Sequence, residues 1–151
     1  MLLMIKDLLK VIITRLNNNS NKNIKNCFND LKNYNGIDWK LYKSNFTNTQ
    51  TIDYYKKIIY QNKNFELILI KWDKDSKTKI HKHPKNGCIM KVLDGKLIEK
   101  RFNKDNICKE SKLEINSIGY IDDNIGTHQI IALEESYSIH LYSPPGFYNT
   151  L

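Results

Sequence analysis

The stretch Ile80–Gly95 constrains this chain most. It reads IHKHPKNGCIMKVLDG and places His81 and His83 two positions apart. Side chains at positions i and i+2 of a strand point to the same face of the sheet. A strand over Thr78–His83 would therefore direct both imidazoles at one point in space, as two ligands of one metal ion require. Two further histidines follow, and all four lie in the second half of the chain.

The same half of the chain alternates short, β-rich segments with turn residues. The Asp94-Gly95 pair is typical of a two-residue hairpin, so we expect Lys96–Phe102 to return as the partner of Cys88–Leu93. Seven or eight such strands with tight turns predict a small double-sheet barrel. The clearest expected strands are Phe65–Trp72, Thr78–His83, Cys88–Leu93, Lys96–Phe102, Leu113–Ile115, Gln129–Leu133 and Ser136–Tyr142.

The beginning of the chain has a helical pattern instead. Apolar residues at Ile5, Leu8, Ile12 and Leu16 recur at the spacing of an amphipathic helix, and a second helix is expected over Asn23–Asn33. At 151 residues the chain has the length of one domain. We therefore expect a single, mainly β domain over 1–151, with helices in 1–45 before a barrel in 54–146.

Composition excludes several classes of function. The net charge of +8 comes from lysines that are spread along the chain and mixed with acidic residues. This favours a solvated surface over a nucleic-acid or membrane partner.

Three cysteines without CxxC spacing do not make a disulfide scaffold, and we expect Cys27 in the core and Cys108 in a turn region. Charges interrupt the apolar N-terminus, and no stretch approaches the roughly 18 apolar residues of a membrane span, so we expect a cytoplasmic protein.

The histidines predict a metal site of an uncommon kind. His81 and His83 are followed by four residues, Cys88, six residues and Gly95, which is the spacing of the first cupin motif with cysteine in place of its glutamate. With His128 as the third ligand, three neutral imidazoles would leave coordination positions open. That donor set suits Fe(II) beside a bound thiolate, and zinc is the alternative. From the residues alone, His140 is a possible fourth ligand.

Three segments together resemble one cupin family, the cysteine dioxygenases, which oxidise a thiol to a sulfinate. The first runs from His81 through Cys88 to Leu97-x-Glu99. The second is Tyr120-Ile-x-Asp-x-Ile-Gly-x-His128, and the third is Ser138-x-His-Leu-Tyr-Ser-Pro-Pro145. The resemblance covers about residues 5–146. It implies a cupin (jelly-roll) barrel that binds one Fe(II) per chain through His81, His83 and His128.

The resemblance also implies roles around the metal. Cys88 and Tyr142 match the pair that forms a thioether cross-link in animal-type members, and Ser138, His140 and Tyr142 match a hydrogen-bonded relay. Positions 138, 140 and 142 would share one face of a strand, which makes the relay plausible on its own. Lys56 stands where the family has an arginine for the substrate carboxylate, and Tyr55 is a lesser candidate. Lysine supplies the charge but no planar fork.

The function expected from the resemblance is the conversion of L-cysteine and O₂ to cysteine sulfinic acid by a monomer. Two alternatives are another small thiol, such as 3-mercaptopropionate or the N-terminal cysteine of a peptide, and a non-catalytic metal-binding cupin. The chain ends at Leu151, soon after Pro144-Pro145, whereas animal-type members continue. We therefore expect a more open site or a weaker enzyme.

Overall fold

A computed structural model describes residues 1–18, 23–45 and 54–147 of the chain. Helical elements come first, and none of those described is long and apolar enough to cross a bilayer. Eight strands follow within 54–147. The helical elements are α1 (Ile5–Asn18), η1 (Ile24–Cys27), α2 (Phe28–Asn33) and η2 (Asp38–Asn45). The strands are β1 (Tyr54–Gln61), β2 (Glu66–Trp72), β3 (Cys88–Asp94), β4 (Leu97–Phe102), β5 (Cys108–Leu113), β6 (Ile118–Ile121), β7 (Thr127–Ala132) and β8 (Ser136–Tyr142).

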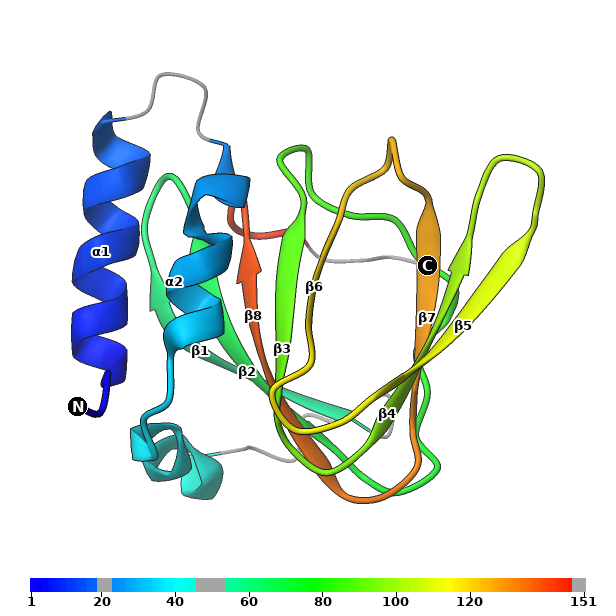
Figure 1. The fold of residues 1–151 in the computed structure, drawn as a ribbon, viewed down its shortest axis with the longest axis horizontal. Coiled ribbons are helices and arrows are strands. Elements are labelled where there is room, and N and C mark those ends of the chain that lie inside the picture. Colours follow the sequence, from blue (N-terminus) through cyan, green and yellow to red (C-terminus); the bar gives the residue numbers. More distant parts are fainter. Residues whose placement is uncertain (19–22, 46–53, 148–151) are drawn as a thin grey trace.

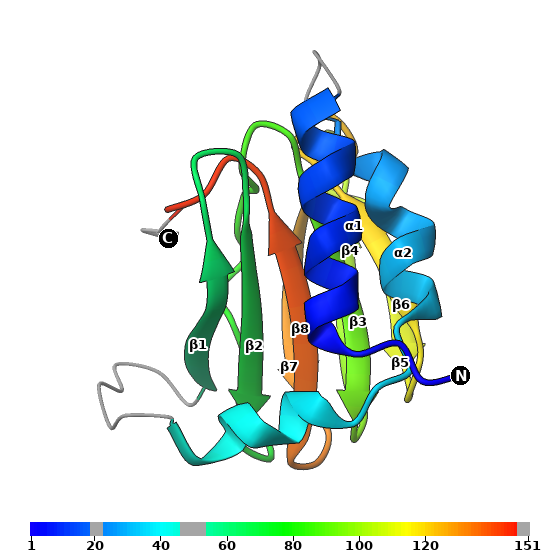
Figure 2. The same cartoon turned by 90° about the vertical axis from the view of Figure 1, so that its left-hand side faces the viewer.

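The strands form two antiparallel sheets that face each other. The larger sheet has the order β1-β2-β8-β3-β6, and the smaller has the order β5-β4-β7. Figure 1 shows the helices on one side of the larger sheet and the smaller sheet on the other, and Figure 2 looks onto the helices with β2, β8 and β3 behind them. The expected class, a mainly β cupin-like barrel preceded by helices, is confirmed.

Each face of the larger sheet has its own apolar core. The outer face packs against the helices, whose buried stripe includes Leu8, Ile12 and Leu16. The inner face meets the smaller sheet across Ile130 and Ala132 of β7. Because successive side chains of a strand alternate between faces, the register of β2, β8 and β3 decides which groups enter the barrel. The inner residues of these strands include Ile68, Ile70, Trp72, Cys88, Met90, Val92, Ser138 and His140.

The expected hairpin at Asp94-Gly95 is wrong. β3 pairs with β8 and β6, whereas β4 pairs with β5 and β7, so the turn crosses from one sheet to the other. Gly95 has a φ of +86°, and a Cβ there would meet the carbonyl oxygen of Glu135 at 2.6 Å. The glycine is required by this left-handed, crowded crossing and not by a two-residue hairpin.

The expected strand over Thr78–His83 is also wrong, although its ends touch β7. Only isolated bridges form, from Lys77 to Ile131 and from His81 to His128. Between them, side chains bind the backbone groups that a ladder would pair. The Oγ1 atom of Thr78 accepts from the N–H of Ile130, and the amide of Gln129 donates to the carbonyl of Thr78. Such local bonds compete with sheet pairing, and the segment remains an extended loop.

Two further strands differ from the expectation. β1 was not foreseen, because it is a half-exposed edge strand whose lysines and tyrosines hide the apolar alternation. β5 replaces the expected strand over Leu113–Ile115 and begins at Cys108, which is exposed. Cys27 is fully buried among the helices, as expected.

Lys91 fastens the helices to the larger sheet. It lies in the middle of β3 on the outer face and is 2% exposed. Its ammonium donates to the carbonyl oxygens of Leu31 (3.1 Å), Lys32 (2.9 Å) and Tyr34 at the end of α2. These are among the carbonyls that a helix leaves without a partner at its C-terminus, where a positive charge is also favoured. Burial lowers the pKa of Lys91 from its ordinary value.

We predict that Lys91→Met destabilises the fold by about 1–3 kcal/mol, because the carbonyls of Lys32 and Tyr34 lose the ammonium donor and that of Leu31 keeps only the N–H of Tyr34. Urea-induced unfolding followed by circular dichroism measures this change. Lys96→Met is the matched control, since Lys96 is exposed and follows the same strand. We expect the control to stay within about 0.5 kcal/mol of the original chain. Equal losses in the two variants would contradict the role of Lys91.

Candidate metal centre

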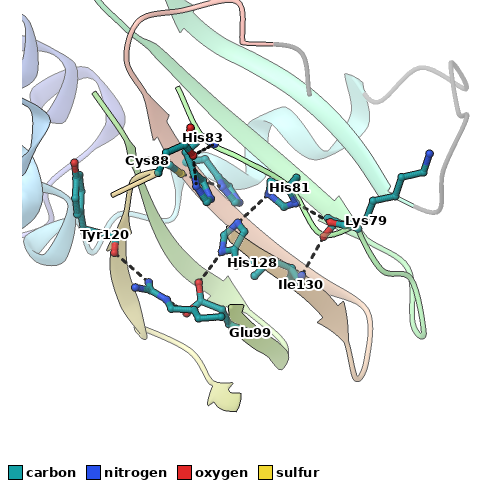
Figure 3. Close-up of polar contacts among 12 residues, drawn as sticks. Lys79, His81, His83, Cys88, Glu99, Tyr120, His128 and Ile130 are labelled. Carbon is teal, nitrogen blue, oxygen red and sulfur yellow. Dashed lines mark hydrogen bonds and ion pairs between the residues drawn. The ribbon is translucent and has the colours of Figure 1, made fainter. Parts of the chain in front are cut away.

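Three histidines meet inside the barrel, as their spacing predicted. His81 and His83 come from the segment between β2 and β3, and His128 comes from β7 (Figure 3). One nitrogen from each ring lies within 4.8 Å of the others. The backbone of His81 pairs with that of His128, with N–O distances of 2.9 and 3.3 Å. This bridge holds the loop against β7 and brings the rings together.

The hydrogen bonds of two of the rings fix where their protons lie. His81 Nδ1 is 2.8 Å from the carbonyl oxygen of Lys79, and His128 Nδ1 is 2.8 Å from the carboxylate of Glu99. Both partners can only accept, so each Nδ1 carries a proton, and a neutral ring in this tautomer has its lone pair on Nε2. The two Nε2 atoms face each other at 2.9 Å. Two lone pairs at this distance repel each other unless a cation lies beside both.

His83 supplies the second sign of a cation site. Its side chain is buried, and neither ring nitrogen has a hydrogen-bond partner among the described residues. A buried polar nitrogen without a partner costs free energy, and a metal ion would satisfy it. Burial, followed by the neighbouring imidazoles, lowers the pKa of His81 to about 4 and that of His83 to about 2. Both rings are therefore neutral at pH 7, which is the form that binds a metal.

Glu99 is a functional residue that the sequence reasoning did not assign. It lies on the inner face of β4, where Oε2 accepts from His128 and Oε1 accepts from Arg101 Nε, both at 2.8 Å. Burial alone would raise the pKa of Glu99, but these hydrogen bonds keep it below the ordinary value. The available signal was the alternation over Lys96–Phe102, which put Glu99 and Arg101 on the same face as Leu97.

A chain of hydrogen bonds runs along β8 beside the three histidines. The indole N–H of Trp72 is only a donor, so Ser138 Oγ accepts from it (2.8 Å) and donates to His140 Nε2 (2.7 Å). Burial lowers the pKa of His140 well below its ordinary value, so the ring is neutral and carries its proton on Nδ1. That atom is 3.3 Å from the hydroxyl of Tyr142. The relay places His140 behind Tyr142 and not among the three clustered rings.

Cys88 completes this group from the neighbouring strand. It lies directly opposite Tyr142 in the β3–β8 register, and its sulfur is 3.9 Å from His140 Nδ1. Burial is the main cause that raises the pKa of Cys88, so the group is a thiol at pH 7. Burial also raises the pKa of Tyr142 well above its usual value. Both groups are therefore protonated and in position to interact with each other.

A pocket opens between β1 and the loop that carries His81. Lys56 and Tyr54 line it from β1, and His81, His128, His140 and Tyr142 lie along it. Desolvation lowers the pKa of Lys56, while the nearby Glu66 opposes the shift. The structure does not bring Tyr55 to this pocket. Its hydroxyl lies 3.5 Å from Asp73, and the ammonium of Lys71 lies 5.5 Å from the centre of its ring.

Solved structures with similar folds define the class of protein. KdgF from Halomonas sp. matches with a TM-score of 0.58 and 18% identity, covering 68% of this chain and 87% of that one. A cupin-2 domain containing protein from Shewanella frigidimarina matches with a TM-score of 0.54 and 17% identity, covering 75% of this chain and 96% of that one. At these identities the likeness concerns the fold, and the fold is that of a cupin.

Sequence comparisons identify the family within the cupin fold to which this chain belongs. The model of the family described as "Cysteine dioxygenase type I" matches residues 7–150, and the chain belongs to that family. It is 31% identical over 122 residues to cysteine dioxygenase type 1 of Rattus norvegicus, and the match covers 74% of this chain and 59% of the rat protein. The human protein of the same name is 33% identical over 103 residues, and the match covers 61% of this chain and 52% of the human protein. The chain thus spans little more than half of these relatives.

We predict that Glu99→Gln lowers the affinity for a divalent metal by about 10–100-fold, because the amide no longer holds the His128 proton on Nδ1 with a negative charge. Titration of the metal-free protein with Co(II), followed by absorbance, measures the affinity. Glu110→Gln is the matched control, since Glu110 is exposed on the adjacent strand β5. If Glu99→Gln binds as tightly as the control, Glu99 has no part in ordering the site.

Proposed function

We propose that this chain is an Fe(II)-dependent thiol dioxygenase that converts L-cysteine to cysteine sulfinic acid. The reaction balances as RS⁻ + O₂ → RSO₂⁻, in which sulfur gives up four electrons and dioxygen accepts them. The observation that carries the proposal is the three-histidine cluster beside the Ser138–His140–Tyr142 relay in one pocket. Membership of the cysteine dioxygenase type I family supports it. On this proposal the chain acts as a cytoplasmic monomer on a small thiol and O₂.

His81, His83 and His128 would hold the iron, and their geometry suits a cation for the reasons given above. When bound, Fe(II) supplies a site at which a thiolate and dioxygen can react. Three neutral imidazoles add no negative charge to the ion and leave coordination positions for both reactants. Glu99 contributes its negative charge indirectly, through the hydrogen bond to His128.

The other residues bind and orient the substrate. Lys56 lines the pocket and stands where the family has its arginine, and it would bind the carboxylate of the substrate. Apolar side chains of Ile70, Trp72 and Ile130 line the same pocket and would limit the water around the sulfur. Because His140 donates to the Tyr142 oxygen, the Tyr142 O–H remains available to donate to the Cys88 sulfur or to a group bound in the pocket.

We expect the Fe(II)-loaded protein to consume one O₂ for each L-cysteine and to yield a product heavier by two oxygen atoms. An oxygen electrode and mass spectrometry of the same sample measure both quantities. His83→Ala should lose the iron and the activity together, since the His83 ring is buried in the cluster and neither of its nitrogens has a hydrogen-bond partner among the described residues. Lys85→Ala, in the same loop and exposed, should keep both. Full activity in His83→Ala would exclude the proposed site.

Tyr142→Phe tests the relay separately from the metal. We expect kcat to fall by about 100-fold, because the variant loses the hydroxyl that donates into the pocket. The iron content should not change, since Tyr142 is not among the three clustered histidines. Steady-state oxygen uptake and iron analysis give the two readouts. Loss of iron along with activity would mean that Tyr142 supports the fold of the site instead.

We propose further that Cys88 and Tyr142 can form a thioether. The Cys88 sulfur would bond to the ring carbon beside the Tyr142 hydroxyl, with loss of one hydrogen from each residue and with O₂ as the oxidant. The two residues are directly paired across β3 and β8, which supports this assignment. The mass of the aerobically turned-over protein should then be lower by two hydrogen atoms, and Cys88→Ser should remove the difference.

Another small thiol is the second candidate substrate, and Lys56 is the observation that favours it. An ammonium group cannot bind a carboxylate through the two parallel hydrogen bonds that a guanidinium forms. Iron retention without oxygen uptake on L-cysteine would direct the search to 3-mercaptopropionate and to peptides with N-terminal cysteine. No uptake with any thiol would leave a metal-binding cupin without turnover.

A further inference from the structure

Positive charge predominates in the lining of the pocket beside the histidines. Its lining includes Lys56, Lys79 and Lys82, and no described residue of the lining is an aspartate or a glutamate. None of these three ammonium groups forms an ion pair with the described part of the chain. Low-dielectric walls concentrate the field of such charges in a cleft and attract anions to it.

The three lysines lie on two walls of the pocket. Lys56 is on β1, in register with Ile70 of β2, which also lines the pocket. Lys79 and Lys82 flank His81 on the loop that replaces the expected strand. Figure 3 shows the Lys79 side chain extending outward from the loop, away from His128. A ligand held at the histidines can therefore meet one cation on the β1 wall and others toward the rim.

The nearest acidic groups are already engaged elsewhere. Glu66 lies on β2 near Lys56, is buried, and accepts from the backbone of Gly146. Glu99 is held by His128 and Arg101. Asp123 accepts the backbone N–H of His83. Of these, Glu66 lies close enough to Lys56 to oppose the shift of its pKa. Neither Lys79 nor Lys82 forms an ion pair with a described carboxylate.

We propose that the site prefers small thiols with two anionic groups over thiols with one. This inference rests on the proposed thiol oxidation and names its class of substrate. Lys56 would meet the first carboxylate, and Lys79 with Lys82 would meet a second one nearer to the rim.

A series of thiols that differ only in charge tests the preference. Mercaptosuccinate carries two carboxylates, 3-mercaptopropionate carries one, and cysteamine carries none. We expect kcat/KM of the iron-loaded protein for mercaptosuccinate to exceed that for 3-mercaptopropionate by about fivefold, and cysteamine to be the poorest. The advantage should shrink as salt is raised, since the charges are near the surface.

The double variant Lys79→Gln/Lys82→Gln tests whether the preference for two carboxylates comes from the lysines at the pocket rim. It should reduce kcat/KM for mercaptosuccinate to the level of 3-mercaptopropionate and leave the latter within about twofold. Lys77→Gln/Lys85→Gln is the matched control, because both lysines are exposed neighbours that do not line the pocket. Equal rates for the two acids, or equal losses in the two double variants, would overturn the inference.

Binding of succinate separates this inference from the proposed activity. Succinate has both carboxylates and no sulfur, so its binding to the metal-loaded protein needs no turnover. Calorimetry should show binding that the Lys79→Gln/Lys82→Gln variant loses and the control variant keeps. If no thiol is oxidised but succinate behaves in this way, the thiol oxidation is wrong and the dianion preference stands. If L-cysteine is oxidised and succinate does not bind, the preference is wrong and the oxidation stands.

Discussion

The position of β8 between β2 and β3 is the constraint on which the rest of the structure depends. Its alternation sends Ser138, His140 and Tyr142 into the barrel and sends Ile139 and Leu141 into the core beneath the helices. A shift of one residue would exchange the two sets and bury the relay against α1. The apolar core and the polar relay therefore specify the same register. Burial of the apolar side chains on one face of β8 therefore fixes the position of the polar relay on its other face.

The candidate metal centre keeps a carboxylate, but this group hydrogen-bonds to His128 and is not one of the clustered side chains. Cys88 occupies the position at which the first cupin motif has glutamate, so the cluster consists of imidazoles alone. Glu99 returns a negative charge behind His128, where it also fixes the tautomer. Arg101 then balances Glu99 and donates onward to the carbonyl of Tyr120 on β6. The ion pair of Glu99 and Arg101 thus connects His128, on the smaller sheet, to Tyr120, on the larger sheet.

The sequence predicted the parts of this arrangement that depend on local pattern. The limits of β8 and the convergence of His81 with His83 agree with the structure, because period-two alternation and i, i+2 spacing act within one segment. His128 lies on another strand, and the cupin pattern and the family resemblance indicated it. It could not predict which strands share a sheet. Asp94-Gly95 looks the same at a hairpin as at a crossing between sheets, and only the contact of Gly95 with Glu135 distinguishes them. Glu99 and Trp72 were missed for a related reason: each acts on a residue that another strand supplies.

The loop over Thr78–His83 shows how a wrong prediction of a strand can still give the right site. In a regular strand His81 and His83 would share one face, and the backbone groups that point toward β7 would be paired with it. Here the Thr78 and Gln129 side chains take over part of that pairing, and a single bridge between His81 and His128 holds the end of the loop. Because this segment is an extended loop and not a regular strand, Lys79 and Lys82 can lie at the pocket rim while both imidazoles remain inside the barrel. Because Lys79, His81, Lys82 and His83 share one short loop, the charge at the entrance is coupled to the geometry of the three-histidine cluster.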